Sequence, residues 1–211
     1  MMSLRFSRLI IAAVASVCFS GIAEAVSYTT TLLPTLVGTY SFATGINNSG
    51  QVVGYAYDVD TLNYARATLW NGTTATYLGT LGGISSAATG INNAGQVVGY
   101  AYDAGNNARA ALWSGGTVTD LGTLGGRSSA AWGINDSGQV VGSADTPGNR
   151  RHATLWNGTT ATDLGTVGGI SSAAFAINNS GQVVGWASNA GNPERAALWN
   201  GATATRSEER R

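Results

Sequence analysis

Short runs of alternating hydrophobic and polar residues, separated by turn-forming residues, fill the chain after its first 25 residues. In residues 85–124 the runs SSAATGIN, QVVGYAY, ARAALW and TVTDLGTL are separated by the turns NNAG, DAGNNA and SG. A hydrophobic period of two is typical of β-strands, and no stretch of comparable length after the N-terminal segment has a helical period. The pattern therefore predicts four short antiparallel strands in this segment.

Three sequence blocks recur along the chain at nearly constant spacing. The first block is INNSGQVVGYA at Ile46, INNAGQVVGYA at Ile91, INDSGQVVGSA at Ile134 and INNSGQVVGWA at Ile177, with spacings of 45, 43 and 43 residues. The second is a Leu-Trp pair before a turn, which places tryptophans 43 residues apart at Trp70, Trp113, Trp156 and Trp199. The third is LGTLGG at Leu78 and Leu121, with LGTVGG at Leu164. Such regularity indicates a repeat architecture.

Each repeat has the size of a β-propeller blade, which is a four-stranded antiparallel sheet of about 40 to 50 residues. The strand at residues 52–57 has small or apolar side chains on both faces, as expected for a sheet packed between two neighbours. We predict an all-β repeat fold, a β-propeller of four blades or an arc of a larger one, with a β-solenoid as the alternative. The repeats extend approximately over residues 42–83, 87–126, 130–169 and 173–205.

The two ends of the repeat region suggest how the fold could close. The segment at residues 28–37 aligns with a fourth strand, because Leu33 precedes the next repeat isoleucine by 13 residues, as the leucine of LGTLGG does in the second repeat. The last repeat ends in NGATATRSEERR without a Leu-Gly-Thr block. We expect the 28–37 strand to pair beside the strand near Leu198 and close a ring, which would remove exposed sheet edges. The alternative is that RSEERR marks a truncated or frameshifted end.

The first 25 residues have the features of a secretory signal peptide. Two arginines precede an apolar run at residues 9–18, and Ala23-Glu24-Ala25 matches a cleavage site. The apolar run is shorter than the roughly 18 residues that a transmembrane helix needs, so we expect cleavage rather than anchoring. The chain is predicted to be secreted, extracellular or periplasmic, as a single repeat domain over residues 26–211 with no membrane insertion after cleavage.

Charge and cysteine content exclude several classes of protein. Basic and acidic residues balance at 11 each and lysine is absent, so no basic excess is available to bind nucleic acid or an anionic membrane surface. The only cysteine, Cys18, lies inside the predicted signal peptide, which leaves no disulfide or thiolate metal site. The 30 glycines, 3 prolines and periodic hydrophobic residues favour many short strands over disorder.

The blocks INNSGQVVG, ALWNG and LGTLGG resemble the bacterial extracellular repeats called the HAF family, over nearly all of the chain after residue 25. The family is named for a His-Ala-Phe tripeptide before Leu-Trp, and in this chain the tripeptide positions read RAT, RAA, HAT and RAA. The resemblance implies a secreted bacterial repeat protein without an established biochemical activity.

The first position of that tripeptide forms a column of basic side chains. Its members are Arg66, Arg109, His152 and Arg195. In superimposed repeats they would form a row or ring that could bind an anion or an acidic glycan, which makes them the candidate ligand surface.

Cross-strand pairing is the favoured interpretation of this column. Counting across a two-residue turn after each tryptophan sets Arg66 opposite Tyr77, Arg109 opposite Asp120, His152 opposite Asp163 and Arg195 opposite Arg206. The first three pairs are favourable, whereas the last brings two like charges together. We therefore expect the last hairpin to be abnormal.

Acidic residues and the single histidine supply further candidates. The aspartates that follow the second strands are Asp58, Asp60, Asp103 and Asp145. Oxygen-rich loops can hold calcium, but their spacing is not that of an EF-hand and aspartate is an ordinary turn residue. His152 could enter a Ser-His-Asp triad, yet no nucleophile-elbow sequence is present.

We therefore predict no catalytic residue, no cofactor and no metal site. The chain is interpreted as a non-enzymatic module for extracellular binding or adhesion, with a glycan or a protein as its partner. Tyr55, Tyr100 and Trp186 recur at one position and could stack on a carbohydrate, although packing between blades explains them first. The alternatives are a propeller-type hydrolase or lyase acting on an extracellular polymer, and a fragment of a larger repeat protein.

Overall fold

The computed structural model describes residues 27–35, 40–58, 64–191, 193–201 and 204–206. The predicted signal peptide at residues 1–25 and the candidate Asp60 lie outside the described residues. The chain divides into two units, Met1–Leu32 and Leu33–Arg211, and all strands described belong to the second unit. The described part of the first unit, residues 27–32, forms no strand and is exposed. Within the described ranges no helix is long and apolar enough to cross a bilayer.

Sixteen β-strands form four sheets. The first sheet consists of β1 (Ser41–Ile46), β2 (Val52–Asp58), β3 (Tyr64–Asn71) and β4 (Thr74–Tyr77). The second consists of β5 (Gly82–Ile91), β6 (Val97–Asp103), β7 (Ala108–Ser114) and β8 (Thr117–Asp120). The third consists of β9 (Ser129–Ile134), β10 (Gln139–Asp145), β11 (Arg151–Asn157) and β12 (Thr160–Gly165). The fourth consists of β13 (Gly168–Ile177), β14 (Val183–Asn189), β15 (Glu194–Trp199) and β16 (Ala204–Arg206).

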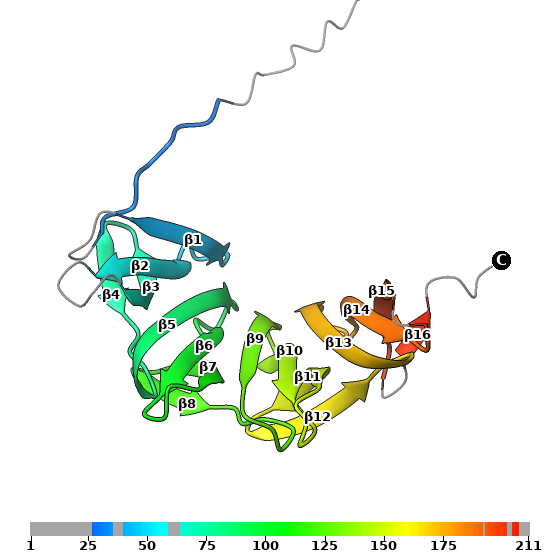
Figure 1. Cartoon of the computed structure of the whole chain (residues 1–211). Helices are drawn as coiled ribbons and strands as arrows, with labels where there is room; N and C mark the ends of the chain where they lie inside the picture. The colour runs from blue at the N-terminus through cyan, green and yellow to red at the C-terminus, as the bar shows by residue number, and fades with distance from the viewer. Residues whose placement is uncertain (1–26, 36–39, 59–63, 192, 202–203, 207–211) are drawn as a thin grey trace, which may run out of the picture. The chain divides into compact units, whose positions relative to one another are not determined.

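Every sheet is antiparallel, and its four strands lie side by side in chain order. Figure 1 shows the sheets following one another from β1–β4 to β13–β16. Each sheet packs against the next one in the chain, but among the described strands the first and fourth sheets do not pack together, so the sheets are not closed into a ring. The prediction of an all-β fold of four-stranded antiparallel repeats is confirmed, and the units are consistent with propeller blades.

Three hydrophobic cores lie between neighbouring sheets. The core between the second and third sheets contains Val98 and Ala110 of one sheet and Val140 and Trp156 of the other. We call the face of each sheet that meets the next sheet in the chain its trailing face; in the second sheet this face contains Val98. The opposite face is the leading face. Burying side chains of this size contributes roughly 2 kcal/mol each, which makes these cores the main source of cohesion between sheets.

A bulge in the first strand of every sheet explains the glycine of the QVVG block. The register between β5 and β6 shifts between Ala88 and Gly90, and the other three sheets have equivalent shifts. A Cβ atom on Gly99 of β6 would overlap the carbonyl oxygen of Ala87 in β5. The two backbones therefore approach too closely for any residue other than glycine at this position.

Within the described residues, the predicted strand at residues 28–37 and its pairing beside Leu198 are not found. Residues 27–35 contain no strand, and residues 36–37 lie outside the described residues. The outer edge of β15 is occupied instead by β16, where Leu198 lies opposite Thr205. ATATR continues the Thr-Ala alternation of the other fourth strands, and this alternation forms the strand without the Leu-Gly-Thr block.

The N-terminal segment contacts the recurring tryptophan of the first repeat, Trp70. The indole Nε1 of Trp70 donates a hydrogen bond to the Pro34 carbonyl oxygen at 2.7 Å. In the fourth sheet, Trp199 Nε1 donates in the same way to Leu164, in the preceding repeat, at 2.9 Å. The Pro34 carbonyl oxygen thus binds Trp70 one residue after the position that aligns with Leu164, and Trp70 is buried.

Candidate functional site

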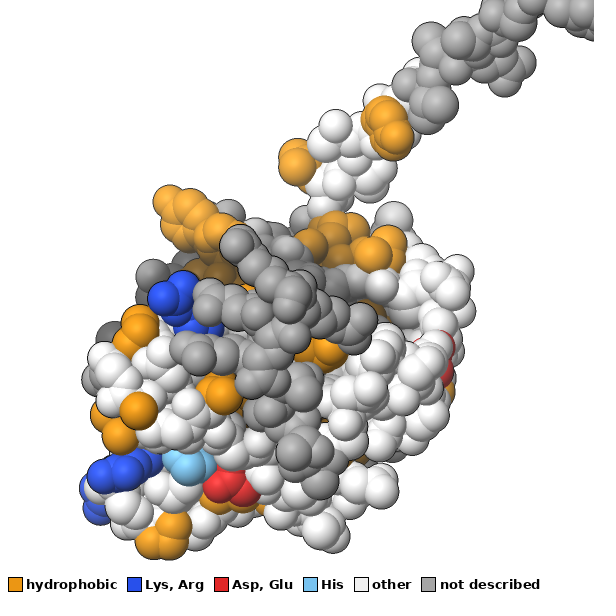
Figure 2. Space-filling view, turned by 90° about the vertical axis from the view of Figure 1, so that its right-hand side faces the viewer, with side chains coloured by type: hydrophobic (Ala, Val, Ile, Leu, Met, Phe, Trp, Pro, Cys, Tyr) orange, Lys and Arg blue, Asp and Glu red, His pale blue; other side chains and the backbone are white. Residues whose placement is uncertain are grey.

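The predicted basic column occupies one position in the third strand of each sheet. Each member lies opposite an alanine of the second strand: Arg66 opposite Ala56, Arg109 opposite Ala101, His152 opposite Ala144 and Arg195 opposite Ala187. Each member thus belongs to a different sheet, and Arg195 is exposed whereas the other three are half-buried. Figure 2 shows few charged side chains on the face that it presents, with basic, histidine and acidic side chains close together at its lower left.

Two of the predicted pairs are confirmed as side-chain contacts. Arg109 Nε lies 3.0 Å from Asp120 Oδ2, and Arg109 Nη1 also donates to the Arg127 carbonyl oxygen at 3.3 Å. His152 Nδ1 lies 2.8 Å from Asp163 Oδ2. Both pairs are partly exposed and occupy equivalent places in their repeats, which supports a structural role in the hairpins.

The backbone register of these hairpins differs from the prediction by two residues. The prediction starts the turn directly after the tryptophan, but Asn71 extends β3 and pairs with Thr74. The loop therefore begins at Gly72, whose φ of 59° is the left-handed value that the first central residue of a tight hairpin turn requires. As a consequence Asp120 lies opposite Ala111, and the long Arg109 side chain reaches it diagonally.

The same shift changes the two other predicted pairs. Tyr77 lies opposite Thr68 instead of Arg66. Arg206 lies opposite Ala197 and thus not directly opposite Arg195 as predicted; it takes the diagonal place that Asp120 has beside Arg109. The strands β15 and β16 pair in the same register as β3 and β4, so the expectation of an abnormal last strand pair is wrong.

Of the aspartates after the second strands, Asp103 and Asp145 accept backbone hydrogen bonds. Asp103 Oδ1 accepts hydrogen bonds from the backbone N–H of Asn107 at 2.9 Å and from its side-chain amide at 3.2 Å. These bonds, the backbone one foremost, hold the pKa of Asp103 below its usual value. Asp145 Oδ2 accepts a bond from the Ser128 backbone N–H at 3.2 Å. Within the described ranges no group of three or more His, Cys, Asp or Glu side chains is placed to hold one metal ion.

A first hollow, of about 360 Å³, lies where the Ile-Asn-Asn or Ile-Asn-Asp turns of all four repeats converge. The turns are linked by a ladder of hydrogen bonds that runs in one direction along the chain. Asn47 Nδ2 donates to the Asn92 carbonyl oxygen at 3.2 Å, and the Asn48 backbone N–H donates to Asn93 Oδ1 at 3.0 Å. The same two bonds recur between the second and third repeats and between the third and fourth. The asparagines of the INN block are therefore explained by sheet-to-sheet linkage.

Asp136 is the one carboxylate in this ladder among the described residues. Its Oδ1 accepts the Asn93 backbone N–H at 2.9 Å, and its Oδ2 accepts the side-chain amides of Asn93 and Asn179, each at 3.1 Å. The backbone bond from Asn93, followed by the two amide bonds, lowers the pKa of Asp136.

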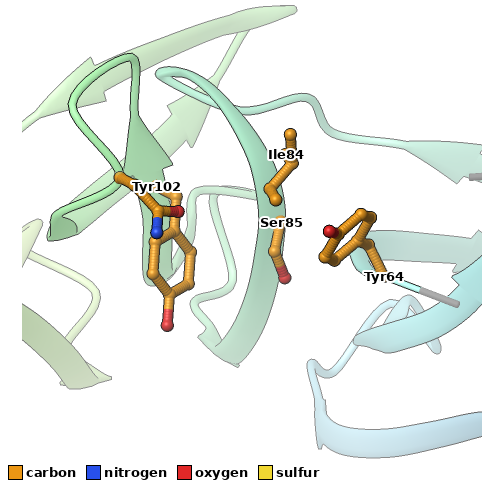
Figure 3. A pocket seen from close by; sticks show the side chains of 5 residues that line it. Tyr64, Ile84, Ser85 and Tyr102 are labelled. Atoms are coloured by element: carbon orange, nitrogen blue, oxygen red, sulfur yellow. The ribbon is translucent and has the colours of Figure 1, made fainter. Parts of the chain in front are cut away.

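A second hollow, of about 340 Å³, lies between the first and second sheets and is lined by tyrosines. We call it the aromatic groove; its lining residues are Tyr64 of β3, Ile84 and Ser85 of β5, Tyr102 of β6 and Asn106 of the turn after β6. Figure 3 shows Tyr64 and Tyr102 on opposite sides of Ile84 and Ser85. Side chains from two sheets thus frame an open surface, and the described residues that line it are uncharged.

Contacts within and between the sheets hold this groove in shape. Ser85 Oγ donates to the Ala65 carbonyl oxygen at 3.0 Å, which ties β5 to β3. The Tyr102 ring meets the ring of Tyr100 edge to face, with centroids 6.3 Å apart. Burial, followed by repulsion from Tyr102, Tyr55 and Tyr57, raises the pKa of Tyr100.

The aromatic groove is specific to the first interface. At the next interface the equivalent positions are occupied by Asn107, Arg127, Ser128, Asp145 and Asn149. Ser128 and Asp145 are joined there by the hydrogen bond described above. The serine and the turn asparagine are retained, whereas the two tyrosines and the isoleucine are replaced by polar or charged side chains.

Comparison with known proteins gives no assignment for the chain. No protein-family model matches it, and no curated protein is significantly similar to it. Conclusions about its function rest on its own residues and their geometry.

Sequence reasoning missed the aromatic groove because it compared repeats for what they share. The available signal was a departure from the pattern. The first repeat spacing is 45 residues where the others are 43, and Tyr64 stands where the later repeats have Asn107, Arg150 and Pro193. At the recurrent aromatic position, the Tyr55 ring stacks on the Phe42 ring with centroids 5.2 Å apart, and the Tyr100 ring contacts the Tyr102 ring edge to face.

Proposed function

We propose that this chain is a secreted, non-enzymatic binding module and that the aromatic groove binds a neutral extracellular saccharide. The observation that carries the proposal is that the repeat is broken at this groove. A binding site that serves one ligand needs only one copy, whereas positions that hold sheets together recur in every repeat. Rim positions on a rigid scaffold are also where binding residues are commonly found.

The chemistry of the groove fits a sugar. Tyrosine offers an apolar ring face that can cover the C–H face of a pyranose, together with a hydroxyl at its edge. The Ser85 hydroxyl can still accept a hydrogen bond after donating to Ala65, and Asn106 contributes an amide. None of the described residues that line the groove carries a charge at neutral pH, which favours a neutral ligand over an acidic one. The volume of about 340 Å³ lies within the range of small-ligand pockets.

Membership of the HAF family and secretion are part of the same proposal. The INNSGQVVG, ALWNG and LGTLGG blocks support the family, and the apolar run with its Ala-Glu-Ala site supports export. The non-enzymatic assignment is supported by the His152–Asp163 contact, because the Arg109–Asp120 pair fills the same place in the preceding repeat. A histidine that replaces an arginine in a structural column does not require a catalytic explanation.

A glycan array of neutral and acidic oligosaccharides, probed with the purified chain, tests this function. We expect binding to neutral glycans, followed by saturable titration of the best one in solution. Tyr64→Ala and Tyr102→Ala should each weaken that binding by roughly 10-fold or more, because stacking on an aromatic ring and its buried area are lost. Tyr64→Phe keeps the ring and should lose less.

The matched control is Tyr40→Ala, since the Tyr40 side chain is 63% exposed and does not line the groove. Unchanged affinity in this variant would show that the losses are local. If acidic glycans bind instead and Arg109→Ala abolishes that binding, the basic column is the ligand surface and the groove proposal is wrong. Equal binding by wild type and both tyrosine-to-alanine variants would also contradict it.

A further inference from the structure

The trailing face of the fourth sheet has the composition of an interface but is uncovered. Val53, Val98 and Val141 occupy one position on the trailing faces of the first three sheets, and each is 0% exposed. Val184 occupies that position in the fourth sheet and is 46% exposed. Ala196 is likewise exposed, whereas its counterparts in the earlier sheets are fully buried.

The inner part of the leading face of the first sheet is exposed at positions that are buried or half-buried in the other three sheets. Ala88, its counterpart in the third sheet and its counterpart in the fourth are all 0% exposed, but Ala43 in the first sheet is exposed. Ile46 is 68% exposed, whereas the other three repeat isoleucines are half-buried. The outer part of this face is covered by the chain itself, through the contact of Trp70 with Pro34.

The directional ladder leaves matching hydrogen-bonding groups at these two faces. In each of the first three repeats the first asparagine of the block donates to the next repeat, but Asn178 Nδ2 donates only to Gln182 of its own turn. The Asn179 backbone N–H has no acceptor within the described part of the chain. At the other end, Asn48 Oδ1 has no donor there, although Asn93 Oδ1 accepts one from the preceding repeat. Donors thus remain on the fourth sheet and acceptors on the first.

A hollow of about 210 Å³ marks the place where a following sheet would sit. Its lining on the fourth sheet includes Ile177, Asn178, Gln182 and Val184. At the internal interfaces the residues equivalent to Asn178, Gln182 and Val184 meet the next repeat, and Gln51 Oε1 lies only 3.5 Å from the position of a Cβ on Gly95. The shape left open is therefore that of a leading face.

We propose that this hollow binds a second copy of the same chain, head to tail, by receiving the leading face of the partner's first sheet. The partner's Ala43 and Ile46 would cover Val184 and Ala196, and Asn178 and Asn179 would donate to the carbonyl of Asn47 and the side chain of Asn48. The interface continues the three internal ones with the same residue types. That complementarity favours a second copy over an unrelated partner.

One position in the fourth sheet differs from its internal counterparts and is compatible with this docking. Ala176 replaces the glycine found at Gly45, Gly90 and Gly133. A Cβ atom at Gly90 would lie 3.5 Å from the nearest atom of the following sheet, and one at Gly133 would lie 3.0 Å away. An alanine therefore fits after a shift of at most a few tenths of an ångström.

Sedimentation of the purified full chain over a wide range of concentration tests the proposal. We expect a concentration-dependent mass of two or more copies for wild type, since a heterologous contact either closes into a ring or continues as a filament. Val184→Asp and Ala43→Asp should each abolish association with the unfolding temperature retained, because both side chains are exposed in the single chain. Ile84→Asp is the matched control, since Ile84 is 47% exposed on the aromatic groove, and it should still associate.

Mixing the two interface variants distinguishes head-to-tail docking from any symmetric face-to-face contact. Val184→Asp retains an intact leading face and Ala43→Asp an intact trailing face, so an equimolar mixture should form a one-to-one complex although neither variant associates alone. Asn48→Ala removes one acceptor and should weaken wild-type association roughly five- to tenfold, while Ser49→Ala should not. A monomeric wild type, or a mixture that remains monomeric, would overturn the proposal.

Discussion

The first two interfaces of this molecule have the same interior and different rims. Between the first and second sheets, the Ala67 backbone N–H donates to Ser86 Oγ at 3.0 Å. Between the second and third sheets, the Ala110 backbone N–H donates to Ser129 Oγ at 2.9 Å. A buried tryptophan faces the preceding sheet at both places. These positions are buried between two sheets, so a change in their size or polarity would affect the packing of both sheets.

The rims differ because nothing encloses them. The first interface carries the aromatic groove, and the second carries Arg127, the Ser128–Asp145 contact and the Arg109–Asp120 pair. In the central ladder the first interface pairs Asn48 with Asn93, whereas the second pairs Asn93 with the carboxylate of Asp136. The comparison shows that one scaffold can accept a neutral, aromatic rim or a charged one without altering the core beneath it.

The largest effect is expected from a substitution in the sheet that both interfaces share. Gly99→Ala in β6 places a Cβ atom against the Ala87 carbonyl oxygen, and backbone cannot move aside as a side chain can. We expect a loss of at least about 3 kcal/mol in the free energy of unfolding, at the upper end of overpacking costs. Urea denaturation followed by tryptophan fluorescence measures it.

Gly148→Ala is the control for that experiment. Gly148 has an ordinary φ and open space around its Cβ position, so the change should stay within about 0.5 kcal/mol. If Gly99→Ala were equally mild, the close approach of β5 and β6 would not be a constraint on the sequence.

A smaller effect is expected from the serines that link the sheets. Ser129→Ala leaves the buried Ala110 N–H without an acceptor and should cost about 1 to 3 kcal/mol. Ser86→Ala should cost somewhat less, because Ser129 Oγ also donates to the Gly122 carbonyl oxygen at 2.7 Å. Denaturation of both variants in parallel measures the difference. A negligible cost for either serine would show that the interiors are not equivalent.

Much of this architecture follows from the sequence because the constraint repeats. A position such as Val53, Val98 and Val141 is buried in the same way three times, so its pattern stands out from a single chain. Periodicity and turn chemistry were sufficient to predict four strands per repeat. The Arg109–Asp120 contact also followed from the hairpin, since a long side chain reaches its partner even when the register is misjudged by two residues.

What the sequence did not predict depends on local geometry or on departures from the pattern. The hairpin loop begins at Gly72 because that residue has a left-handed φ, which the Asn-Gly pair alone does not specify. The strand β16 was missed because the Leu-Gly-Thr block was taken as its marker. The aromatic groove required knowing that Tyr64 and Tyr102, 38 positions apart, face each other across two sheets.

A modest effect is expected from the charged rim of the second interface. Asp120→Asn removes the charge that faces Arg109, and both side chains are partly exposed, at 37% and 20%. Such pairs contribute about 0.2 to 1 kcal/mol and are screened by salt. A double-mutant cycle with Arg109→Gln, at low and high ionic strength, isolates the coupling from the separate bond to Arg127. A coupling that does not fall with salt would contradict an electrostatic pair.

The smallest effect on stability at neutral pH is expected at Asp136. This residue lies in the hydrogen-bond ladder at the second and third interfaces. Hydrogen bonds from Asn93 and Asn179 lower the pKa of Asp136 in the folded chain below the ordinary value of 3.8. The ionised carboxylate therefore contributes stability above pH 3.8, and that contribution is lost as the pH falls through the folded pKa.

Asp136→Asn restores the residue type found at this ladder position in the other repeats, so it should change the free energy of unfolding little at pH 7. It should also make the decline of stability in acid shallower than in wild type, because an amide does not titrate. Urea denaturation at neutral and acidic pH measures how the free energy of unfolding depends on pH in wild type and in the variant. Asn179→Ala, which removes one of the three donors, should give an intermediate slope. An unchanged acid dependence in Asp136→Asn would mean that the ladder gains nothing from its carboxylate, and that the first interface and the later ones respond to pH alike.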